Sequence, residues 1–317
     1  MNITDRLIER TIKTRNPSVI GLDPDIFKIP DCYKQVKAGH PFEAVANAIT
    51  AMNQDVIDVI APLVPAVKPQ MAFYEKYGSW GVSAFEKTVA YAKQKGLVVI
   101  EDAKRNDIGN TARAYAEGHL GYVETLDGSF LPSIDVDFLT VNPYLGSESL
   151  QPFINACKCH QKGIFVLVKT SNASSGEIQN VIAPGGITIS QQIAHYLADC
   201  AAKCMGKYGY SSIGAVVGAT YPEEAASLRK AMPRNYFLVP GYGAQGAGPK
   251  DILPCFNEDG LGAIVNSSRG ILYTYMSDTQ RAHCSRDEYL TGVKNATHQM
   301  QQDLYSALKA CYPKMCY

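Results

Sequence analysis

Residues 97–107 read Leu-Val-Val-Ile-Glu-Asp-Ala-Lys-Arg-Asn-Asp, an apolar run that ends in charged residues. The run predicts a buried strand over 97–104. Side chains alternate along a strand, so Asp102 and Lys104 are expected on one face, with Asp107 on the next turn. Two carboxylates then bracket one lysine, and a carboxylate beside a lysine keeps it protonated. An ammonium group held in this way stabilises a carbanion and then donates a proton to it.

Similar β-branched runs recur along the chain, each ending in polar or glycine-rich residues. With 97–104, the candidate strands are 18–23, 65–68, 137–142, 164–170, 213–219, 236–240 and 263–266. Segments of helical periodicity lie between most of them, at 42–60, 80–95, 147–157, 190–205 and 222–230, with a long terminal helix over 285–310. Strands that alternate with helices predict a parallel sheet, and about eight such units fit a (β/α)8 TIM barrel. A doubly wound open sheet is the alternative fold.

The organisation of the chain indicates one unit. The sequence contains no linker, low-complexity tract or repeat of fixed period, which predicts a single domain over residues 1–317. The stretch 119–135 is expected to be an irregular excursion before the fourth strand. Glu101 departs from the strand pattern, because its parity points it at the helix layer, where an apolar residue is expected. We expect that departure to bear on packing.

Composition excludes several classes of protein. Lys plus Arg and Asp plus Glu both number 30, and a net charge of zero indicates neither a nucleic-acid partner nor an anionic membrane. Residues 1–15 are charged throughout, unlike a secretory signal, and no apolar run reaches the ~18 residues of a membrane span. The nine cysteines form no C-x-x-C pair, which favours reduced thiols in the cytoplasm. Cys200 and Cys204, at helical spacing, fit a metal site less well than a packed helix face.

Polar residues follow most of the predicted strands. They are Asp23 and Asp25 after the first strand, Lys68 and Gln70 after the second, residues 169–172 after the fifth, 240–246 after the seventh and 266–270 after the eighth. In a barrel these strand ends converge on one mouth, where barrel enzymes place their chemistry. Each end alone fits a turn or a cap. Their joint occurrence predicts an active site.

The last two strand ends predict a phosphate site. Glycine-rich backbone exposes N–H groups, a following helix N-terminus favours anions, and Arg269 supplies a charged fork that matches phosphate geometry. Residues 241–246 also match the dinucleotide fingerprint G-x-G-x-x-G. That fingerprint belongs in a first βαβ unit and expects an acidic residue about 20 positions later, where this chain has Asn266. A dinucleotide site is therefore rejected.

The usual catalytic bases and metal ligands are missing from the predicted mouth. None of the six histidines follows a predicted strand, and the chain has no H-E-x-x-H, G-x-S-x-G or P-loop motif. Lysines and aspartates without histidine or metal suit carbanion chemistry supported by fixed charges.

Together these motifs resemble the orotidine 5′-monophosphate decarboxylase family. The segment D-A-K-R-N-D-I-G-N-T at 102–111 is similar to that family's D-x-K-x-x-D signature, in the form of its bacterial branch with the longer chain. The resemblance runs nearly end to end, through G-L-D-P-D at 21, A-V-K-P-Q at 66, T-V-N-P-Y-L-G at 140, K-T-S-N at 169, P-G-Y-G-A-Q-G at 240 and N-S-S-R-G at 266. Joint occurrence in this order makes the resemblance specific.

The resemblance implies a cofactor-independent carboxy-lyase that converts orotidine 5′-monophosphate to uridine 5′-monophosphate and CO2, the last step of de novo pyrimidine biosynthesis. Lys104 would protonate C6 after CO2 leaves, inside a charge network completed by Lys68, Asp102 and Asp107. Asp107 and Thr111 would come from the partner subunit of a homodimer with shared sites. The implied substrate-binding residues are Asp23 and Lys68 at the ribose, Ser171 at the pyrimidine ring, Gln245 and Arg269 at the phosphate, and also Thr111 and Pro240. No metal is implied.

Two other functions remain open. A Mg²⁺-dependent sugar-phosphate decarboxylase or aldolase on the same scaffold shares D-x-K-x-x-D but uses further Glu and His residues. Here Thr170, Ser171 and Asn172 stand where such a histidine follows the fifth strand. A non-catalytic nucleotide-binding protein is the other possibility, although a pure binder has no need for the array around Lys104. Sensitivity to EDTA, or tight binding without turnover, distinguishes these functions.

Overall fold

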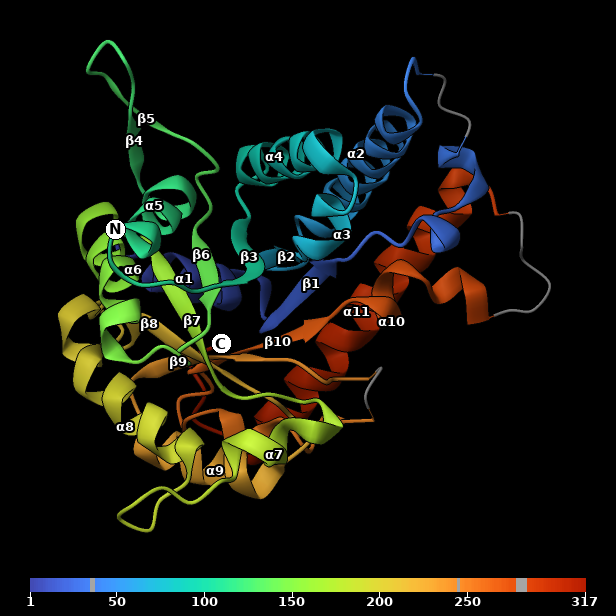
Figure 1. Cartoon of the computed structure of the whole chain (residues 1–317). Helices are drawn as coiled ribbons and strands as arrows, with labels where there is room; N and C mark the ends of the chain where they lie inside the picture. Colours follow the sequence, from blue (N-terminus) through green and yellow to red (C-terminus); the bar gives the residue numbers. More distant parts are fainter. Residues whose placement is uncertain (35–37, 244–245, 278–283) are drawn as a thin grey trace.

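The structure, a computed structural model, describes residues 1–34, 38–243, 246–277 and 284–317. Within them, eight parallel strands close into a barrel in the order β1-β10-β9-β8-β7-β6-β3-β2 (Figure 1). The barrel strands are β1 Ser18–Leu22, β2 Ala66–Pro69, β3 Val98–Arg105, β6 Phe138–Val141, β7 Gly163–Lys169, β8 Ser211–Val217, β9 Asn235–Val239 and β10 Ala263–Ser267. The predicted TIM barrel is confirmed, and its closure rules out the open sheet.

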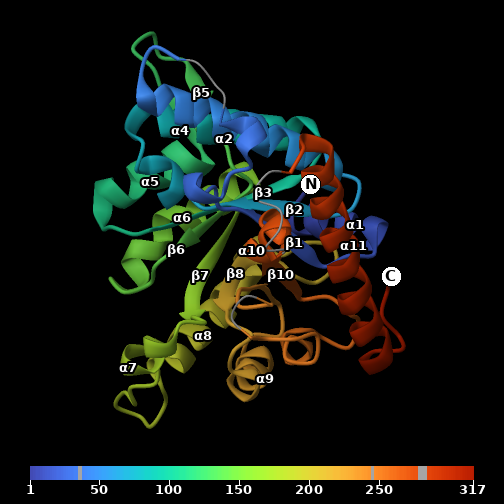
Figure 2. The ribbon, with the colours of Figure 1, turned by 90° about the vertical axis from the view of Figure 1, so that its right-hand side faces the viewer.

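Helices surround the barrel on all sides (Figure 2). The longer ones are α1 Ile3–Thr14, α2 Pro41–Ile60, α4 Gly78–Gln94, α5 Gly109–Leu120, α6 Ser147–His160, α8 Ile189–Cys200, α9 Pro222–Ala231 and α11 Arg286–Cys311. Short ones are α3 Ala72–Glu75, α7 Gly176–Gln179, α10 Arg269–Leu272 and the 3-10 turns Ile26–Lys28, Asp31–Tyr33, Ala173–Ser175, Ala201–Cys204, Leu253–Cys255 and Thr274–Ser277. The helix predicted over 190–205 is too long by one turn, because α8 ends at Cys200 and continues as a 3-10 turn.

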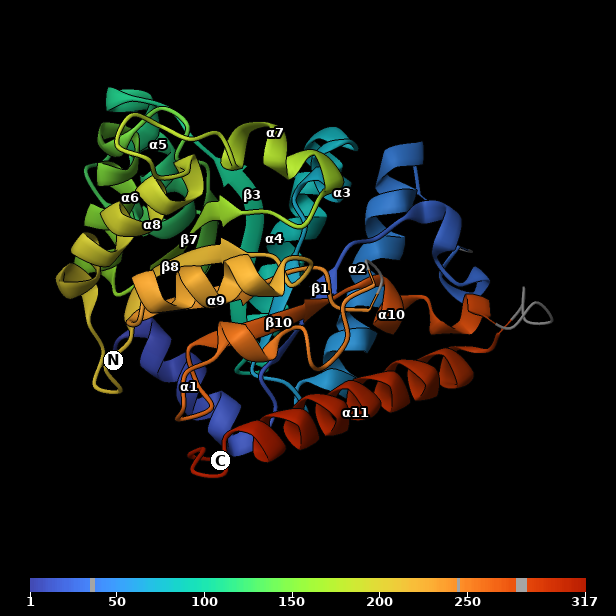
Figure 3. The same cartoon turned by 90° about the horizontal axis from the view of Figure 1, so that it is seen from below.

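The terminal helix α11 lies along one side of the barrel and packs against α2 (Figure 3). Its first turn carries a capping box: Ser285 accepts from the Glu288 backbone N–H, and the Glu288 side chain accepts from the Ser285 backbone N–H. Such reciprocal bonds satisfy two donors that a helix end otherwise leaves unpaired. The predicted start of this helix at Ser285 is therefore confirmed as its cap.

Side-chain alternation divides the apolar residues of the strands between two clusters. One cluster fills the barrel and includes Val19, Ala66, Val98, Ile100, Phe138, Phe165, Tyr236, Leu238 and Ile264. The other lies between strands and helices and includes Ile20, Val67, Val99, Leu139, Ile164, Val166 and Val265. The interior positions that follow Ala66 and Ile100 are Lys68 and Asp102. The alternation that fills the barrel therefore also directs these charged side chains into its mouth.

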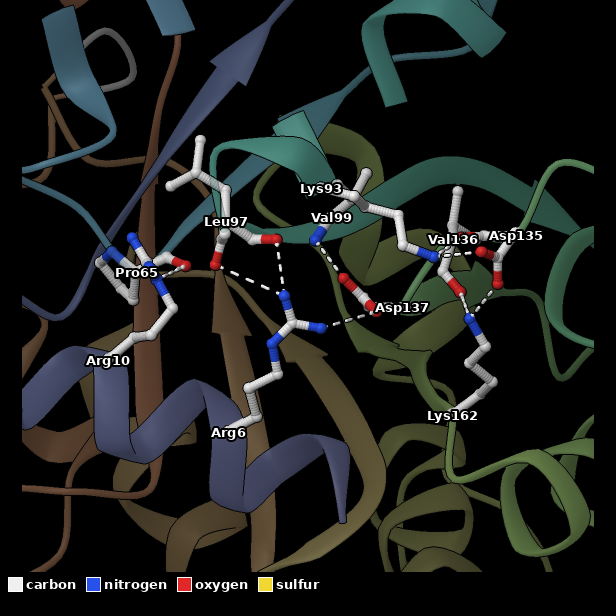
Figure 4. A network of polar contacts seen from close by, with 11 residues as sticks. Arg6, Arg10, Pro65, Lys93, Leu97, Val99, Asp135, Val136, Asp137 and Lys162 are labelled. Atoms are coloured by element: carbon white, nitrogen blue, oxygen red, sulfur yellow. Dashed lines mark hydrogen bonds and ion pairs between the residues drawn. The ribbon is translucent and has the colours of Figure 1, made fainter. Parts of the chain in front are cut away.

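Helix α1 closes the opposite end of the barrel. Ile3, Leu7 and Ile8 belong to the cluster that fills the interior. From the same helix, Arg6 donates to the Leu97 carbonyl and Arg10 to the Pro65 carbonyl, both at the amino ends of strands (Figure 4). The charged segment 1–15 was not predicted to be a helix. Ile3, Leu7, Ile8 and Ile12 recur at helical spacing, so the signal for this helix was present in the sequence.

The stretch 119–135 contains regular structure, so its prediction as irregular is wrong. Strands β4 Tyr122–Glu124 and β5 Phe130–Pro132 form an antiparallel hairpin that projects beside α5 (Figure 1). Its turn contains Asp127 and Gly128, with Gly128 at φ 79°, a common hairpin signal. Both strands are exposed, and exposed strands lack the alternation of apolar and polar residues that predicts a strand.

None of the described helices is long and apolar enough to cross a membrane. The nine cysteines are free thiols. Cys200 and Cys204 are buried among the apolar residues of the helix layer, in agreement with the packed helix face that their spacing predicted.

Candidate active site

Three charged side chains meet at the mouth of the barrel. Asp102 accepts from Lys68 Nζ at 2.7 Å through Oδ2 and from Lys104 Nζ at 2.6 Å through Oδ1. Lys68 comes from β2, and the other two from β3. The prediction that Asp102 and Lys104 share a face is confirmed. One carboxylate therefore holds two ammonium groups, of which Lys68 is buried and Lys104 reaches solvent.

The charges of this cluster stabilise one another. Burial favours the neutral form of Asp102, but the positive charges of Lys68 and Lys104 outweigh it and hold the pKa of the carboxyl well below its usual range. Burial likewise acts to lower the pKa of Lys68, but the carboxylates of Asp102 and Asp23 reverse the effect, and the pKa is raised. Asp102 and Lys68 are therefore both charged near neutral pH.

Two neutral residues that were not among the predicted site residues complete the shell of Asp102. Thr140 Oγ1 donates to Oδ1 at 3.1 Å, and Gln70 Nε2 donates to Oδ2 at 3.0 Å. Thr140 Oγ1 also accepts from the Lys104 backbone N–H at 2.9 Å. Thr140 could have been found from strand alternation, because Phe138, two residues earlier, fills the barrel and residues two apart point to the same face. Gln70 stood at a polar strand end but had no assigned role.

A second part of the mouth is a pocket of about 340 Å³ at the ends of β1, β9 and β10. Its walls include the predicted residues Asp23, Pro240 and Arg269, and also Tyr273, which was not predicted. Tyr273 donates to the Asp23 carbonyl and accepts from the Asp25 backbone N–H, both at 2.8 Å. Asp23 Oδ1 is buried and has no hydrogen-bond partner among the described residues. The pocket thus offers an acceptor at one end and an arginine at the helix start of α10.

The remaining predicted residues lie outside this cluster within one chain. Asp107 Oδ1 accepts from the Ile108 backbone N–H and, among the described residues, makes no ion pair with Lys104. The predicted bracket of two carboxylates is thus half present in a single chain, because the segment after β3 turns away into α5. Thr111 is exposed in the first turn of α5. Gln245 lies outside the described residues.

The residues of the strand end 169–172 do not all serve the mouth of the barrel. Lys169 is buried and pairs with Glu224 Oε2 at 2.9 Å and Asn180 Oδ1 at 2.7 Å, so its charge serves the helix layer. The Ser171 carbonyl accepts from Thr220 Oγ1 at 3.2 Å. Of this run, Ser171 alone stays a predicted substrate contact.

Larger hollows exist elsewhere on the molecule. One of about 810 Å³ lies between α5 and α6, and another of about 690 Å³ lies between the end of β6 and α8. Neither contains the lysine–aspartate cluster, so we assign the site by its chemistry, not by its volume. Among the described residues, no group of three or more His, Cys, Asp or Glu side chains is placed to hold a metal ion.

The sequence and structure are similar to those of known proteins. A family model described as "Orotidine 5'-phosphate decarboxylase / HUMPS family" matches residues 19–282. A relative named orotidine 5′-phosphate decarboxylase from Rhodopirellula baltica is 40% identical over 304 residues, covering 96% of this chain and 99% of the relative. One of the same name from Caldicellulosiruptor bescii is 38% identical over 278 residues, or 87% of this chain and 90% of the relative.

A solved structure of Leishmania donovani OMP decarboxylase has a TM-score of 0.70 and 26% identity, covering 97% of this chain and 99% of that one. The match of a family model to most of the chain, with relatives at this identity over nearly the whole length, shows the family. The chain belongs to the orotidine 5′-phosphate decarboxylase / HUMPS family.

Proposed function

We propose that this protein decarboxylates orotidine 5′-monophosphate to uridine 5′-monophosphate and CO2, completing pyrimidine nucleotide synthesis. The observation that carries the proposal is the Lys68–Asp102–Lys104 cluster at the barrel mouth, beside a pocket with Arg269. The two relatives that are 38–40% identical to this chain are named orotidine 5′-phosphate decarboxylase. We propose that residues 1–317 act as one catalytic domain in the cytoplasm, where the free thiols would stay reduced.

The chemistry follows from the position of Lys104. The bond between C6 and the carboxylate breaks, its electron pair stays on C6, and CO2 departs. The Lys104 ammonium group stabilises the developing negative charge and then transfers a proton to C6. Neutral Lys104 regains a proton from water after product leaves. Before the transfer, Asp102 Oδ1 holds the ammonium group in place by accepting from Lys104 Nζ at 2.6 Å.

Lys104 alone is not sufficient for catalysis. Enzymes lower barriers by ~8–23 kcal/mol, whereas one preorganised electrostatic contact supplies about 3–4 kcal/mol. The remainder comes from binding parts of the substrate that do not react, above all the phosphate. Arg269, which lines the pocket together with Lys28, has the guanidinium fork that suits a phosphate dianion. Gln245 is proposed as a second phosphate contact.

The ribose and base have proposed partners of their own. The buried Asp23 Oδ1, which lacks a partner among the described residues, is an acceptor suited to a ribose hydroxyl. Lys68 is proposed as its donor neighbour. Ser171 is proposed to hydrogen-bond the pyrimidine ring, and Pro240 to line the pocket.

We propose a homodimer in which each site takes residues from both subunits. Asp107 makes no ion pair with Lys104 of its own chain among the described residues, and Thr111 is exposed at the start of α5. Both are therefore free to approach a second copy. In that arrangement Asp107 completes the charge network of the partner's site.

The first experiment mixes purified protein with orotidine 5′-monophosphate in EDTA and follows the loss of orotate absorbance. Conversion to uridine 5′-monophosphate is expected, because the proposed chemistry uses lysine charges and no metal. Lys104→Ala should lower kcat by several orders of magnitude while a nucleotide analogue still binds. Lys87→Ala, which alters an exposed lysine on α4, serves as the matched control and should retain activity.

Other results would redirect the assignment. Near-normal turnover by Lys104→Ala would remove that residue from the mechanism. Folded protein without activity in EDTA, but active on a sugar phosphate with Mg²⁺, would favour the Mg²⁺-dependent enzyme on the same scaffold. Tight nucleotide binding without any turnover would indicate a non-catalytic protein.

A further inference from the structure

A buried acid–base pair lies directly behind the active site. Glu101 precedes Asp102 on β3 and points the opposite way, into the helix layer, as its parity predicts. Its side chain is 0% exposed, and its Oε2 lies 2.7 Å from His119 Nδ1. His119 is itself buried, in the last turn of α5. Glu101 Oε1 is buried without a hydrogen-bond partner among the described residues.

Packing alone does not account for this pair. The neighbours of Glu101 on the same face of β3 are Val99 and Ala103, both apolar. An apolar residue would fill the position without the cost of removing a carboxylate from water, which only the partner and its hydrogen bond offset. A buried hydrogen bond forms only when its two groups meet in one geometry, whereas apolar contacts form in several. The pair therefore fixes the relative position of the two elements that carry it.

That geometry is the placement of α5 on β3. The helix is 12 residues long, so His119 stands about 15 Å from the first turn. The Glu101–His119 contact anchors the far end, and the His119 carbonyl accepts from the Val136 backbone N–H at 3.1 Å, which secures the same turn to the chain returning to β6. Asp107 lies two residues before the helix start, and Thr111 lies in its first turn. A rotation of α5 about its far end therefore shifts both of these residues.

We propose that Glu101 and His119 are positioning residues, which hold α5 against β3 so that Asp107 and Thr111 meet the active site of a second copy of this chain. The inference rests on the proposed function, which assigns Asp107 and Thr111 to the partner's site. Loss of the pair should therefore affect the site to which its own α5 contributes, and not the site built on its own barrel.

Mixed dimers separate these two effects. A Lys104→Ala chain contributes an intact Asp107, and an Asp107→Asn chain contributes an intact Lys104. After subunit exchange, one site in each mixed dimer has both native residues, and activity should return. Glu101→Ala is then added to one chain or to the other, and kcat of the single intact site is measured.

With Glu101→Ala on the Asp107-contributing chain, we expect kcat to fall about 10–100-fold, since a misplacement of about 1 Å costs that much. On the Lys104-contributing chain, the change should stay within about 2-fold. Glu101→Gln should rescue activity in the first arrangement, because its amide N–H can donate to His119 Nδ1. Glu117→Ala, at an exposed glutamate of the same helix, is the matched control and should have no effect in either.

Folding is checked by circular dichroism and thermal unfolding of each mixture. If Glu101→Ala does not fold, the compact apolar pair Glu101→Leu with His119→Leu replaces it, and the same asymmetry is expected. Equal losses in both arrangements, or a loss only on the Lys104-contributing chain, would overturn the inference while leaving the shared site intact. No recovery with native Glu101, despite proven exchange, would overturn the shared site and this inference with it.

Discussion

At Lys104 the backbone adopts φ 52°, a left-handed conformation that costs a residue other than glycine about 1–3 kcal/mol. The pairing of β3 with β6 shifts register between Glu101 and Arg105, so Lys104 stands in a β-bulge. Thr140 on β6 holds this conformation by accepting from the Lys104 backbone N–H. Bulges of this kind redirect side chains, and here Lys104 Nζ lies 2.6 Å from Asp102 Oδ1.

Asp102→Asn tests the electrostatics of the cluster. The variant leaves the buried Lys68 ammonium group without its partner, and the free energy of unfolding should fall by about 3–5 kcal/mol at pH 7. Urea unfolding measures this loss. Asp58→Asn breaks an exposed pair with Lys95 and is the control, with little change expected. A loss at Asp102 no larger than that at Asp58 would contradict the argument.

The difference in the free energy of unfolding between wild type and Asp102→Asn should depend on pH, and the two pKa shifts fix its direction. The pKa of Asp102 is lowered on folding, so its contribution is present above the ordinary value of about 3.9 and is lost as pH falls through the folded value. The pKa of Lys68 is raised, so its contribution is present below about 10.4 and is lost as pH rises through the folded value. The difference between wild type and Asp102→Asn should be flat from about pH 5 to 9 and shrink on both sides.

At the scale of elements, glycine makes room for aromatic side chains inside the barrel. A Cβ added to Gly214 on β8 would lie 2.6 Å from Phe165 Cδ1 and 2.6 Å from the Tyr236 carbonyl oxygen. A Cβ at Gly163 on β7 would lie 2.1 Å from the Phe138 ring. Inside the barrel, aromatic side chains therefore lie next to glycines, which have no side chain. This arrangement lets eight strands close around the aromatic rings.

Gly214→Ala should destabilise the protein by about 1–3 kcal/mol, because the Tyr236 carbonyl belongs to the backbone and cannot move aside. Gly118→Ala on α5 is the matched control. A Cβ there meets no atom within 4 Å, so it should stabilise the helix by up to about 1 kcal/mol. Chemical denaturation of both variants measures the two effects. Equal stability of the two would show that the barrel interior adapts.

For the whole molecule, the end of the barrel opposite the mouth has a purely structural role. The end closed by α1 carries a polar network that includes Arg6, Arg10 and Asp137 (Figure 4). Arg10 donates to the carbonyls of Ala61, Val64 and Pro65 at 3.0–3.1 Å. These carbonyls lie in the connection from α2 to β2, and that of Pro65 also accepts from the Val98 backbone N–H at 3.1 Å. The network secures the barrel without reaching the mouth.

Arg10→Ala should therefore lower the free energy of unfolding by about 1–3 kcal/mol and leave kcat and KM within about 2-fold. Lys13→Ala, at an exposed residue of the same helix, should change neither. Thermal unfolding and steady-state kinetics on the same preparations provide the measurements. A large loss of kcat at unchanged stability would show that the two ends of the barrel are coupled.

Local patterns were sufficient to predict the eight strands of the barrel, the barrel itself, and the placement of Asp102 and Lys104 on one face, because alternation and apolar runs are properties of consecutive residues. Tertiary structure decided what neighbouring strands bring together. Thr140 and Tyr273 reach the site from distant parts of the sequence, and Lys169 turns to the helix layer beside a register shift. Strand register, β-bulges and the packing of α5 determine which residues come together. All three depend on the closure of the whole barrel, which no single segment encodes.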